Sequence, residues 1–252
     1  MIGGRRMKVQ YIKHSGFMVE FEKAAIVFDY YEGDLSLPSK EKHIYFFVSH
    51  KHADHFNHKI FEFAKEYPYI TYVLSSDVKM SEGYMNRHGI SEEARDKIVY
   101  AHKNDRFQLD AQIEVETLTS TDEGVAFLVT YQEEGLLEPV KLYHAGDLNW
   151  WTWIGESEQE YEDMTGRFQQ EMKKLTGRQF DYAFVPLDPR QEERFWWGFD
   201  CFMRAADTNK VFPMHCWEDY SVIGRLKEME QAKSYKERII DIHHCNEWFD
   251  MI

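Results

Sequence analysis

The chain has 252 residues, of which 43% are apolar and 29% are charged, with 14 Gly and 6 Pro. This composition excludes a disordered, collagen-like or low-complexity protein and predicts a compact globular one. Lys and Arg number 30 against 44 Asp and Glu, and the resulting net charge of −14 repels polyanions and acidic membrane surfaces. We therefore expect neither nucleic acid nor a membrane as a partner.

The sequence also limits where the protein acts and what stabilises it. A bilayer-spanning helix needs about 18 apolar residues, whereas the longest apolar runs are short pieces such as residues 44–48, and no signal-peptide core follows Met1. Cys201, Cys216 and Cys245 are odd in number and far apart, which favours reduced thiols over a disulfide framework or a zinc ribbon. We expect a cytoplasmic protein.

The first half of the chain has the periodicity of short strands. Phe17, Val19 and Phe21 alternate with Met and Glu residues, which predicts a half-buried strand. The continuous apolar runs at residues 25–28 and 44–48 indicate strands that are covered on both faces. Helical segments are expected after His58 and at residues 78–88, and further strands at residues 69–74, 113–118, 125–131 and 140–145.

The second half begins with a change to helical spacing. Ser157 and Glu160 match a capping box, and the apolar residues that follow recur at helical intervals: Tyr161, Met164, Phe168, Met172 and Leu175. Strands are then expected at residues 181–186, 210–214 and 238–242, and helices at residues 199–206 and 222–229. No linker or repeat divides the chain, so we expect a single domain over residues 1–252, with two sheets and helical cover.

Metal-capable side chains gather directly after the apolar run at residues 44–48. In an extended segment His50 and His52 project to the same side, and Asp54 and His55 can fold back from the following turn. Three imidazoles and a carboxylate suit a first-row divalent metal. The alternative is a group of surface polar residues at a strand end, but the density of ligand types favours a metal site.

These residues resemble the H-x-H-x-D-H signature of the metallo-β-lactamase superfamily, which also follows a strand. That family continues with an Asp after a later strand, bridging two metals, and with a His after a strand nearer the C-terminus; Asp147 and His215 occupy these places in the right order. The resemblance therefore implies that Asp147 and His215 are ligands. It also implies an α+β fold, the αββα sandwich, in which two mixed sheets pack face to face with helices outside.

The N-terminal segment resembles one branch of that superfamily. His14-Ser15-Gly16-Phe17, followed by an apolar run that ends in Asp29, is similar to the opening of small lactonase-like hydrolases, including the ascorbate-6-phosphate lactonase type. In that branch the opening His and Asp lie near the metal site. We expect Asp29 to accept a hydrogen bond from a ligand imidazole and fix its tautomer. For His14, a supporting role beside the metal and an ordinary turn role both stay open.

One segment departs from the family pattern. A loop between the H-x-H-x-D-H motif and the bridging Asp usually supplies a third His, but residues 119–124 contain none. Asp122, or the hydroxyl of Ser120 or Thr121, is expected to substitute for it. Such a site is richer in oxygen donors, which shifts the preference from zinc toward manganese or iron. Alternatively, only one metal binds tightly.

Further residues are expected to contact a substrate. Trp150 and Trp151 follow the bridging Asp directly and are expected either to line a pocket or to fill the core. Arg190 follows the strand at residues 181–186 and could hold a substrate carboxylate or phosphate bidentately. The alternative is that Arg190 only pairs with Glu192 or Glu193.

The resemblance implies hydrolysis of a small polar or anionic ester, lactone or phosphodiester by a metal-bound hydroxide. Asp54 and Asp147 are the expected catalytic carboxylates, with Asp54 orienting the nucleophile or passing a proton. One or two divalent metal ions are expected, zinc first, with manganese or iron as alternatives.

Two other classes of function stay open. The first is a catalytically weak or inactive metal-dependent sensor of the same fold, which the loop without a His supports and the remaining ligand residues oppose. The second is redox chemistry, because diiron relatives use this scaffold, although they normally carry a flavin domain for which this chain has no room. The expected partner is a small-molecule substrate, and a homo-oligomer is left open.

Overall fold

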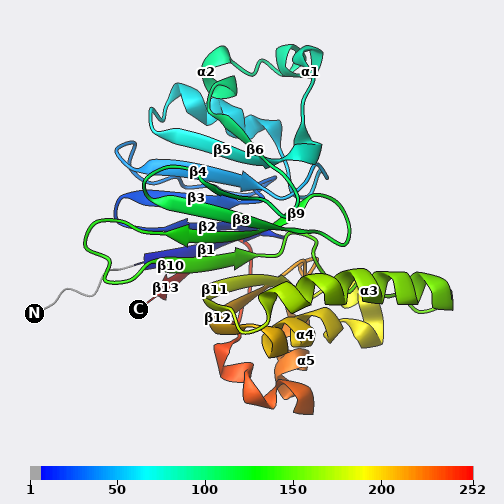
Figure 1. Cartoon of the computed structure of the whole chain (residues 1–252). Coiled ribbons are helices and arrows are strands. Elements are labelled where there is room, and N and C mark those ends of the chain that lie inside the picture. The colour runs from blue at the N-terminus through cyan, green and yellow to red at the C-terminus, as the bar shows by residue number, and fades with distance from the viewer. Residues whose placement is uncertain (1–6, 252) are drawn as a thin grey trace, which may run out of the picture. The chain divides into compact units, whose positions relative to one another are not determined.

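The computed structural model describes residues 7–251, which divide into two compact units (Figure 1). Unit 1 comprises residues 7–102 and 244–251, and unit 2 comprises residues 103–243. Within this described part of the chain, no helix is both long enough and apolar enough to cross a membrane. The single domain over residues 1–252 stays a prediction.

Unit 1 is built on a mixed sheet with the strand order β13-β1-β2-β3-β4-β5-β6. Its antiparallel part pairs β1 with β13 and β2, and β2 with β3, whereas β3 to β6 run parallel. The strands are β1 (Met7–Lys13), β2 (Gly16–Glu20), β3 (Ala24–Phe28), β4 (His43–Val48), β5 (Ile70–Ser75), β6 (Ile98–Ala101) and β13 (Glu247–Met251). The parallel part matters most for function, because the motif at residues 49–55 follows β4.

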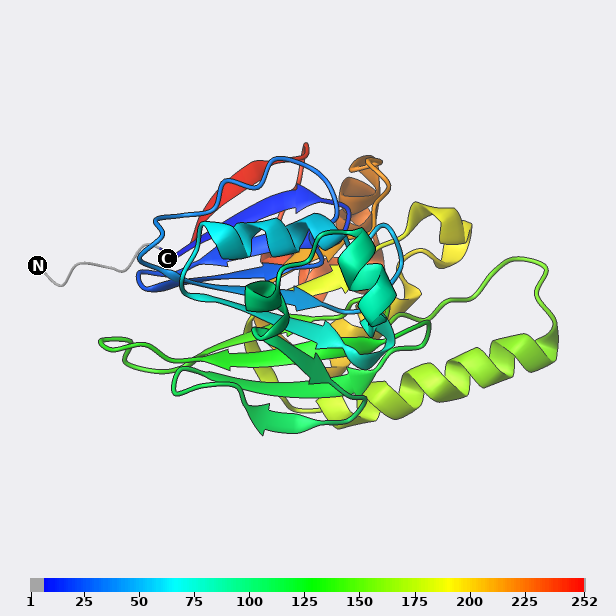
Figure 2. The ribbon, with the colours of Figure 1, turned by 90° about the horizontal axis from the view of Figure 1, so that it is seen from above.

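Short helices cover one face of this sheet. They are the 3-10 helices η1 (His58–Lys65) and η2 (Ser76–Val78) and the α-helices α1 (Glu82–Arg87) and α2 (Glu92–Arg95). Ile60 and Phe61 of η1 belong to the same buried cluster as Phe46 and Tyr72 of the strands, and the rings of Phe61 and Tyr72 are 4.8 Å apart. Figure 2 shows η1, in cyan, lying across the blue strands. This packing covers one face of β4, and every residue of β4 after His43 is buried, as its continuous apolar sequence predicts.

Unit 2 is built on a second mixed sheet, with the order β12-β11-β10-β9-β8-β7. The strands β7 to β10 are antiparallel to their neighbours, whereas β10, β11 and β12 run parallel. Their bounds are β7 (Arg106–Gln108), β8 (Ile113–Thr119), β9 (Val125–Tyr131), β10 (Val140–His144), β11 (Gln179–Pro186) and β12 (Asp207–Met214). The carboxyl ends of β10, β11 and β12 therefore lie at one edge of this sheet.

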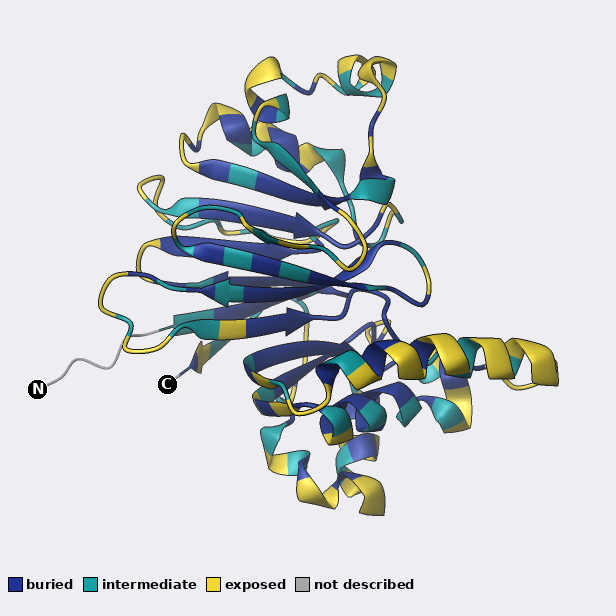
Figure 3. Ribbon diagram, in the orientation of Figure 1, coloured by how far each residue is buried: buried dark blue, intermediate teal, exposed yellow. Residues whose placement is uncertain are grey.

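The helices of unit 2 connect and cover its parallel strands. They are α3 (Glu158–Leu175), η3 (Pro189–Arg194), α4 (Trp197–Ala205), α5 (Ser221–Glu228), η4 (Glu230–Ser234) and η5 (Lys236–Arg238). The predicted capping box starts α3, and Tyr143 of β10 stacks on Phe202 of α4 with ring centroids 4.9 Å apart. Only the second half of α3 is buried, and Figure 3 shows its outward face as exposed.

Most of the sequence-based elements are confirmed, three of them differ in the structure, and the strands β1, β6, β7 and β13 were not predicted. The strand expected at residues 17–21 is β2, but it is covered on both faces, because Met18 is also buried. The expected helix at residues 78–88 shrinks to α1, with Val78 ending η2. The strand expected at residues 238–242 is wrong: only Ile239 bridges to Val211, and Ile239 and Ile242 fill the core from irregular backbone. The α+β class with two mixed sheets is confirmed.

Candidate metal centre

In unit 1, the motif after β4 brings two imidazoles to one side of the chain. His50 is fully buried and His52 is half-buried, whereas Lys51 between them is exposed. Nε2 of His50 lies 3.0 Å from Nδ1 of His52. Two ligands of one cation with bonds of about 2.0–2.1 Å are separated by about 2.8–3.4 Å when the angle between the bonds is about 90–109°. The two nitrogens therefore have the spacing of a chelating pair.

A single buried carboxylate orients this segment. Asp29 follows β3, is 1% exposed and has a left-handed backbone with φ 43°. Its Oδ1 accepts the backbone N–H of Ser49 at 2.7 Å, and its Oδ2 accepts the Ser49 hydroxyl at 2.6 Å. The same Oδ2 lies 2.8 Å from Nδ1 of His55. Asp29 therefore fixes both the start and the end of the motif.

These bonds determine which ring nitrogens can bind a metal. An ionised carboxylate only accepts hydrogen bonds, so Nδ1 of His55 carries the proton and Nε2 carries the lone pair. The hydroxyl of Ser49 gives its one proton to Asp29 and therefore accepts from Nδ1 of His50 at 2.9 Å. Both imidazoles are consequently held in the tautomer that leaves Nε2 for a cation.

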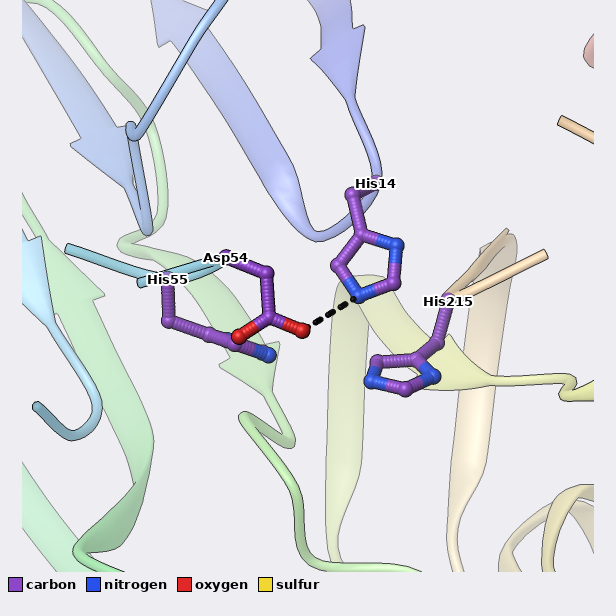
Figure 4. Close-up of side chains that lie close together, drawn as sticks. All are labelled: His14, Asp54, His55 and His215. Carbon is purple, nitrogen blue, oxygen red and sulfur yellow. Dashed lines mark ion pairs between the residues drawn. The ribbon is translucent and has the colours of Figure 1, made fainter. Parts of the chain in front are cut away.

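A second group of donors in unit 1 consists of His14, Asp54 and His55. One nitrogen of each imidazole and one oxygen of the carboxylate all lie within 4.8 Å of one another. Figure 4 shows the ion pair between His14 and Asp54, whose Nε2 and Oδ2 are 3.4 Å apart. The His14 imidazole holds the pKa of the Asp54 carboxyl well below its usual range, although partial burial opposes this. Asp54 is therefore an anionic donor at neutral pH.

In unit 2, a buried carboxylate likewise holds a histidine. Asp188 follows β11 and His215 follows β12, and because these parallel strands end at the same edge their side chains meet. Nδ1 of His215 lies 2.9 Å from Oδ2 of Asp188, which leaves Nε2 for a cation. That Nε2 lies 3.5 Å from Oδ1 of Asp147, which follows β10.

The carboxylate of Asp188 is held by charge as well as by hydrogen bonds. Nε and Nη2 of Arg190 both donate to it, and the indole N–H of Trp217 donates at 3.3 Å. Burial raises the pKa of Asp188, but the hydrogen bonds from His215 and Arg190 outweigh it and bring the pKa to about 2. The carboxylate that Arg190 meets is thus Asp188, rather than Glu192 or Glu193 as the alternative for this residue had it.

The loop without a His brings the carboxylate of Asp122 close to that of Asp147. The carboxylate oxygens of Asp122 and Asp147 lie within 4.8 Å of each other. The hydroxyl of Thr121 is engaged with the backbone of Asn149, donating to its carbonyl at 2.6 Å and accepting its N–H at 3.0 Å. The hydroxyl of Ser120 accepts the N–H of Asp122 at 3.2 Å. Among the three expected substitutes, the side chain of Asp122 is therefore best placed to bind a metal.

The two tryptophans after Asp147 face different neighbours. Trp151 donates its indole N–H to the carbonyl of Asp147 at 2.9 Å, and its ring lies 5.3 Å from that of His215. Trp150 instead donates to Thr165 of α3 and stacks on Phe168. Trp151 is thus placed as a wall beside His215, whereas Trp150 packs against the helix.

Several residues of these clusters carried no functional role in the sequence interpretation. Asp188 holds His215 and Ser49 holds His50, and both could have been found, because Ser49 directly follows β4 and Asp188 lies two residues after β11. Trp217 and the buried amides Asn149 and Gln191, which are joined at 2.9 Å, had no sequence signal.

The donor set suits a divalent metal. Its atoms are imidazole nitrogens and carboxylate oxygens, which fit zinc, manganese and iron. Cys216 follows His215 but belongs to neither group of donors, and burial and the nearby Asp188 raise the pKa of its thiol. The residues present therefore fit the expected ion.

Comparisons with known proteins bear on the fold. No protein-family model matches the sequence, and no curated protein matches it. Igni18, a novel metallo hydrolase from the hyperthermophilic archaeon Ignicoccus hospitalis KIN4/I, is similar with a TM-score of 0.58 and 16% identity over 98% of this chain and 99% of that one. A protein from Parabacteroides distasonis ATCC 8503, proposed to be a metal-dependent hydrolase, has a TM-score of 0.62 and 17% identity over 95% and 94% of the two chains.

A third similar structure is CmlA, a diiron beta-hydroxylase from Streptomyces venezuelae, with a TM-score of 0.51 and 12% identity over 85% of this chain and 45% of CmlA. At such identities the likeness concerns the fold, and one fold can host different reactions. The chain therefore shares its fold with a metallo hydrolase, with a protein proposed to be a metal-dependent hydrolase and with part of a diiron hydroxylase.

Proposed function

We propose that the chain is a metal-dependent hydrolase of the metallo-β-lactamase superfamily. The observation that carries the proposal is that each unit contains a histidine whose Nδ1 is held by a buried carboxylate, Asp29 for His55 and Asp188 for His215. Histidines that bind metals almost always donate their other ring N–H in this way. A pair of such arrangements is hard to explain by packing alone, because buried carboxylates and imidazoles are costly to desolvate.

The proposed ligands are His50, His52, Asp54 and His55 of unit 1, and Asp122, Asp147 and His215 of unit 2. We propose that the protein binds one or two divalent cations, zinc first, with manganese or iron favoured to the extent that Asp122 replaces a histidine. When bound, such a cation lowers the pKa of a coordinated water and polarises a carbonyl or phosphoryl oxygen.

The side chains of the protein supply the remaining requirements of hydrolysis. Asp54, ionised at neutral pH, accepts a proton or a hydrogen bond from the nucleophile and orients it. Trp151, nine-tenths buried beside His215, limits access of bulk water. Arg190 keeps a half-exposed side chain whose Nη1 edge is not used by Asp188, so it can receive an anionic group of a substrate.

The proposed substrates are small polar or anionic esters, lactones or phosphodiesters. The N-terminal His14-Ser15-Gly16-Phe17 segment supports the lactonase-like branch, and the exposed edge of Arg190 supports an anionic substrate. Polyanions are disfavoured by the net charge of −14.

Metal analysis followed by a substrate screen tests this proposal. Wild-type protein purified without chelator should contain divalent metal, whereas His52→Ala and Asp147→Asn should each lower the metal content. His43→Ala is the matched control, because His43 begins β4, at the opposite end from the motif, and contacts Thr71. Unchanged metal content in both ligand variants would contradict the assignment. A metal-replete protein that binds a small ligand yet hydrolyses no ester, lactone or phosphodiester would favour the sensor function instead.

A further inference from the structure

His14 lies in the turn between β1 and β2 in a conformation that the surrounding structure enforces. Its backbone is left-handed, with φ 56°, which is uncommon for a residue other than glycine. The backbone N–H of His14 donates to the phenol oxygen of Tyr11 at 3.0 Å, and the His14 imidazole is only 4% exposed. Strained residues of this kind persist where neighbouring structure determines them and cluster at functional sites.

The turn that carries His14 packs directly on the support of His55. A Cβ added at Gly16 would lie 3.0 Å from the carbonyl of Lys13 and 3.2 Å from that of Asp29, so the turn and Asp29 are in close backbone contact. Asp29 in turn holds Nδ1 of His55 at 2.8 Å. The positions of the His14 and His55 rings are therefore coupled through rigid backbone.

The distance between His14 and Asp54 is informative. A hydrogen bond from an N–H group to an oxygen spans about 2.7–3.2 Å, and the pair of His55 and Asp29 measures 2.8 Å. Nε2 of His14 and Oδ2 of Asp54 are 3.4 Å apart, which is long for such a bond. Two ligands of a tetrahedral cation with bonds of about 2.0–2.2 Å lie about 3.3–3.6 Å apart. The separation therefore fits two ligands of one ion.

A third donor completes the group. His14, Asp54 and His55 each offer one ligand atom within 4.8 Å of the others, and their side chains come from the turn after β1 and from the segment after β4 (Figure 4). Two imidazole nitrogens and one carboxylate oxygen are a common set of protein ligands for a zinc ion that keeps an open position.

We propose that His14 is a direct metal ligand, binding through Nε2 the same divalent cation as Asp54 and His55. This inference rests on the proposed function, because it requires that the chain binds a metal at the motif. It gives the cation three ligands from unit 1 alone, and it replaces the supporting role that the sequence left open for His14. The turn residue thereby adds a nitrogen donor to a chain whose loop at residues 119–124 has no histidine.

Cobalt substitution tests the proposal by counting ligating imidazoles. In protein loaded with Co²⁺, the ring N–H proton of each ligating histidine is shifted far outside the normal proton NMR range. His14→Asn is the first variant, because Asn tolerates the left-handed backbone but cannot reach the position of Nε2. His14→Gln is the second variant, in case the first fails to fold. His43→Asn is the control, since it removes a histidine of the same unit at the far end of β4.

We expect both His14 variants to lose one shifted N–H resonance and to bind one equivalent of cobalt more than about 100-fold more weakly, while His43→Asn matches the wild type. Retention of every shifted resonance in a folded His14 variant would overturn the proposal, even if affinity falls, because His14 would then only position Asp54. Wild-type protein that takes up no cobalt would instead contradict the proposed function.

Discussion

The two units hold a histidine in the same way but support the holding carboxylate differently. In unit 1, Asp29 accepts hydrogen bonds from the backbone and hydroxyl of Ser49 in a fully buried setting. In unit 2, Asp188 is paired with the guanidinium of Arg190, whose side chain is half exposed. The buried groups of Ser49 cannot move away from Asp29, whereas the half-exposed side chain of Arg190 can move into water. Equivalent substitutions should therefore have unequal effects.

The sharpest comparison is Asp29→Asn against Asp188→Asn. An amide at residue 29 must direct its NH₂ group either at the backbone N–H of Ser49 or at Nδ1 of His55, and both places are buried donors. We expect metal affinity to fall about 100-fold. For Asp188→Asn the NH₂ group can replace Oδ1, where the half-exposed guanidinium of Arg190 can swing away and only the backbone N–H of Arg190 loses its acceptor, so we expect a loss nearer about 10-fold.

Metal titration of the two apo-proteins measures both effects, with thermal unfolding recorded alongside. Asp29→Asn should also lower the unfolding temperature more than Asp188→Asn does, because it leaves buried donors without an acceptor. Equal losses of affinity in the two variants would show that the exposure of Arg190 does not matter and would remove the contrast between the units.

The sequence predicted best what depends on local pattern. The apolar run of β4 and the spacing of the motif after it are contiguous, and the helical period of α3 extends over its whole length. The edge strand β13 was missed because its partner β1 is nearly the full chain away, with Met7 paired to Met251. Its exposed Trp248 further weakens the apolar pattern. Residues 238–242 have a stronger apolar pattern, and the last strand was therefore predicted there instead of at β13.

The candidate site shows the same limit. The metal-capable residue types of the motif were visible from spacing, but the carboxylates that hold His55 and His215 follow other strands. Asp188 reaches His215 only because β11 and β12 are parallel neighbours in register, with Pro186 opposite Met214. The backbone strain at His14 and His215, with φ 56° and 63°, has no sequence signature at all. The sequence thus predicted the residue types of the candidate site better than the orientation of their side chains.

Gly198→Ala tests how tightly the segment after Asp147 is packed in unit 2. A Cβ at Gly198 would lie 1.8 Å from the side-chain oxygen of Asn149 and 3.0 Å from the backbone nitrogen of Trp150, in the segment after Asp147. We expect a loss of about 2 kcal/mol in unfolding free energy, together with weaker metal binding. In the described residues, no Cβ added at a glycine of a helix would make such a contact with the segment after β4.

Gly224→Ala is the matched control, because Gly224 lies in α5 with nothing within 4 Å of an added Cβ. It should stabilise the protein by about 0.5–1 kcal/mol in denaturant unfolding. If Gly198→Ala proved as stable as this control, the amide of Asn149 would not be confined as the structure has it.

Arg190→Ala distinguishes two roles of Arg190, which are the ion pair with Asp188 and the proposed binding of an anionic substrate group. Losing an anion-binding edge should lower kcat/KM for phosphorylated substrates about 10-fold, and that for neutral esters much less, because Asp188 keeps hydrogen bonds from His215 and Trp217. Kinetics on a matched pair of substrates measures the difference. An equal loss on both would mean that Arg190 acts only through Asp188.

The smallest expected effect is a change in stability at low pH. Glu116 of unit 2 allows this change to be measured separately from the loss of metal. Glu116 receives two hydrogen bonds from Arg178, at 2.8 and 2.6 Å, and these hold the pKa of its carboxyl below the ordinary 4.5, although burial opposes them. The ion pair is partly exposed, so it contributes about 1 kcal/mol or less.

Because the pKa of Glu116 is lower in the folded protein, the stability that it contributes is present above pH 4.5 and is lost as pH falls through the folded value. Glu116→Gln should therefore lower the unfolding temperature slightly at pH 7, and the difference from wild type should shrink below pH 4.5. Thermal unfolding across this range measures it. The metal content of Glu116→Gln should follow that of the wild type throughout, because Glu116 belongs to neither group of ligands. A variant that lost metal at higher pH than the wild type would instead link the sheet of unit 2 to the acid sensitivity of the metal centre.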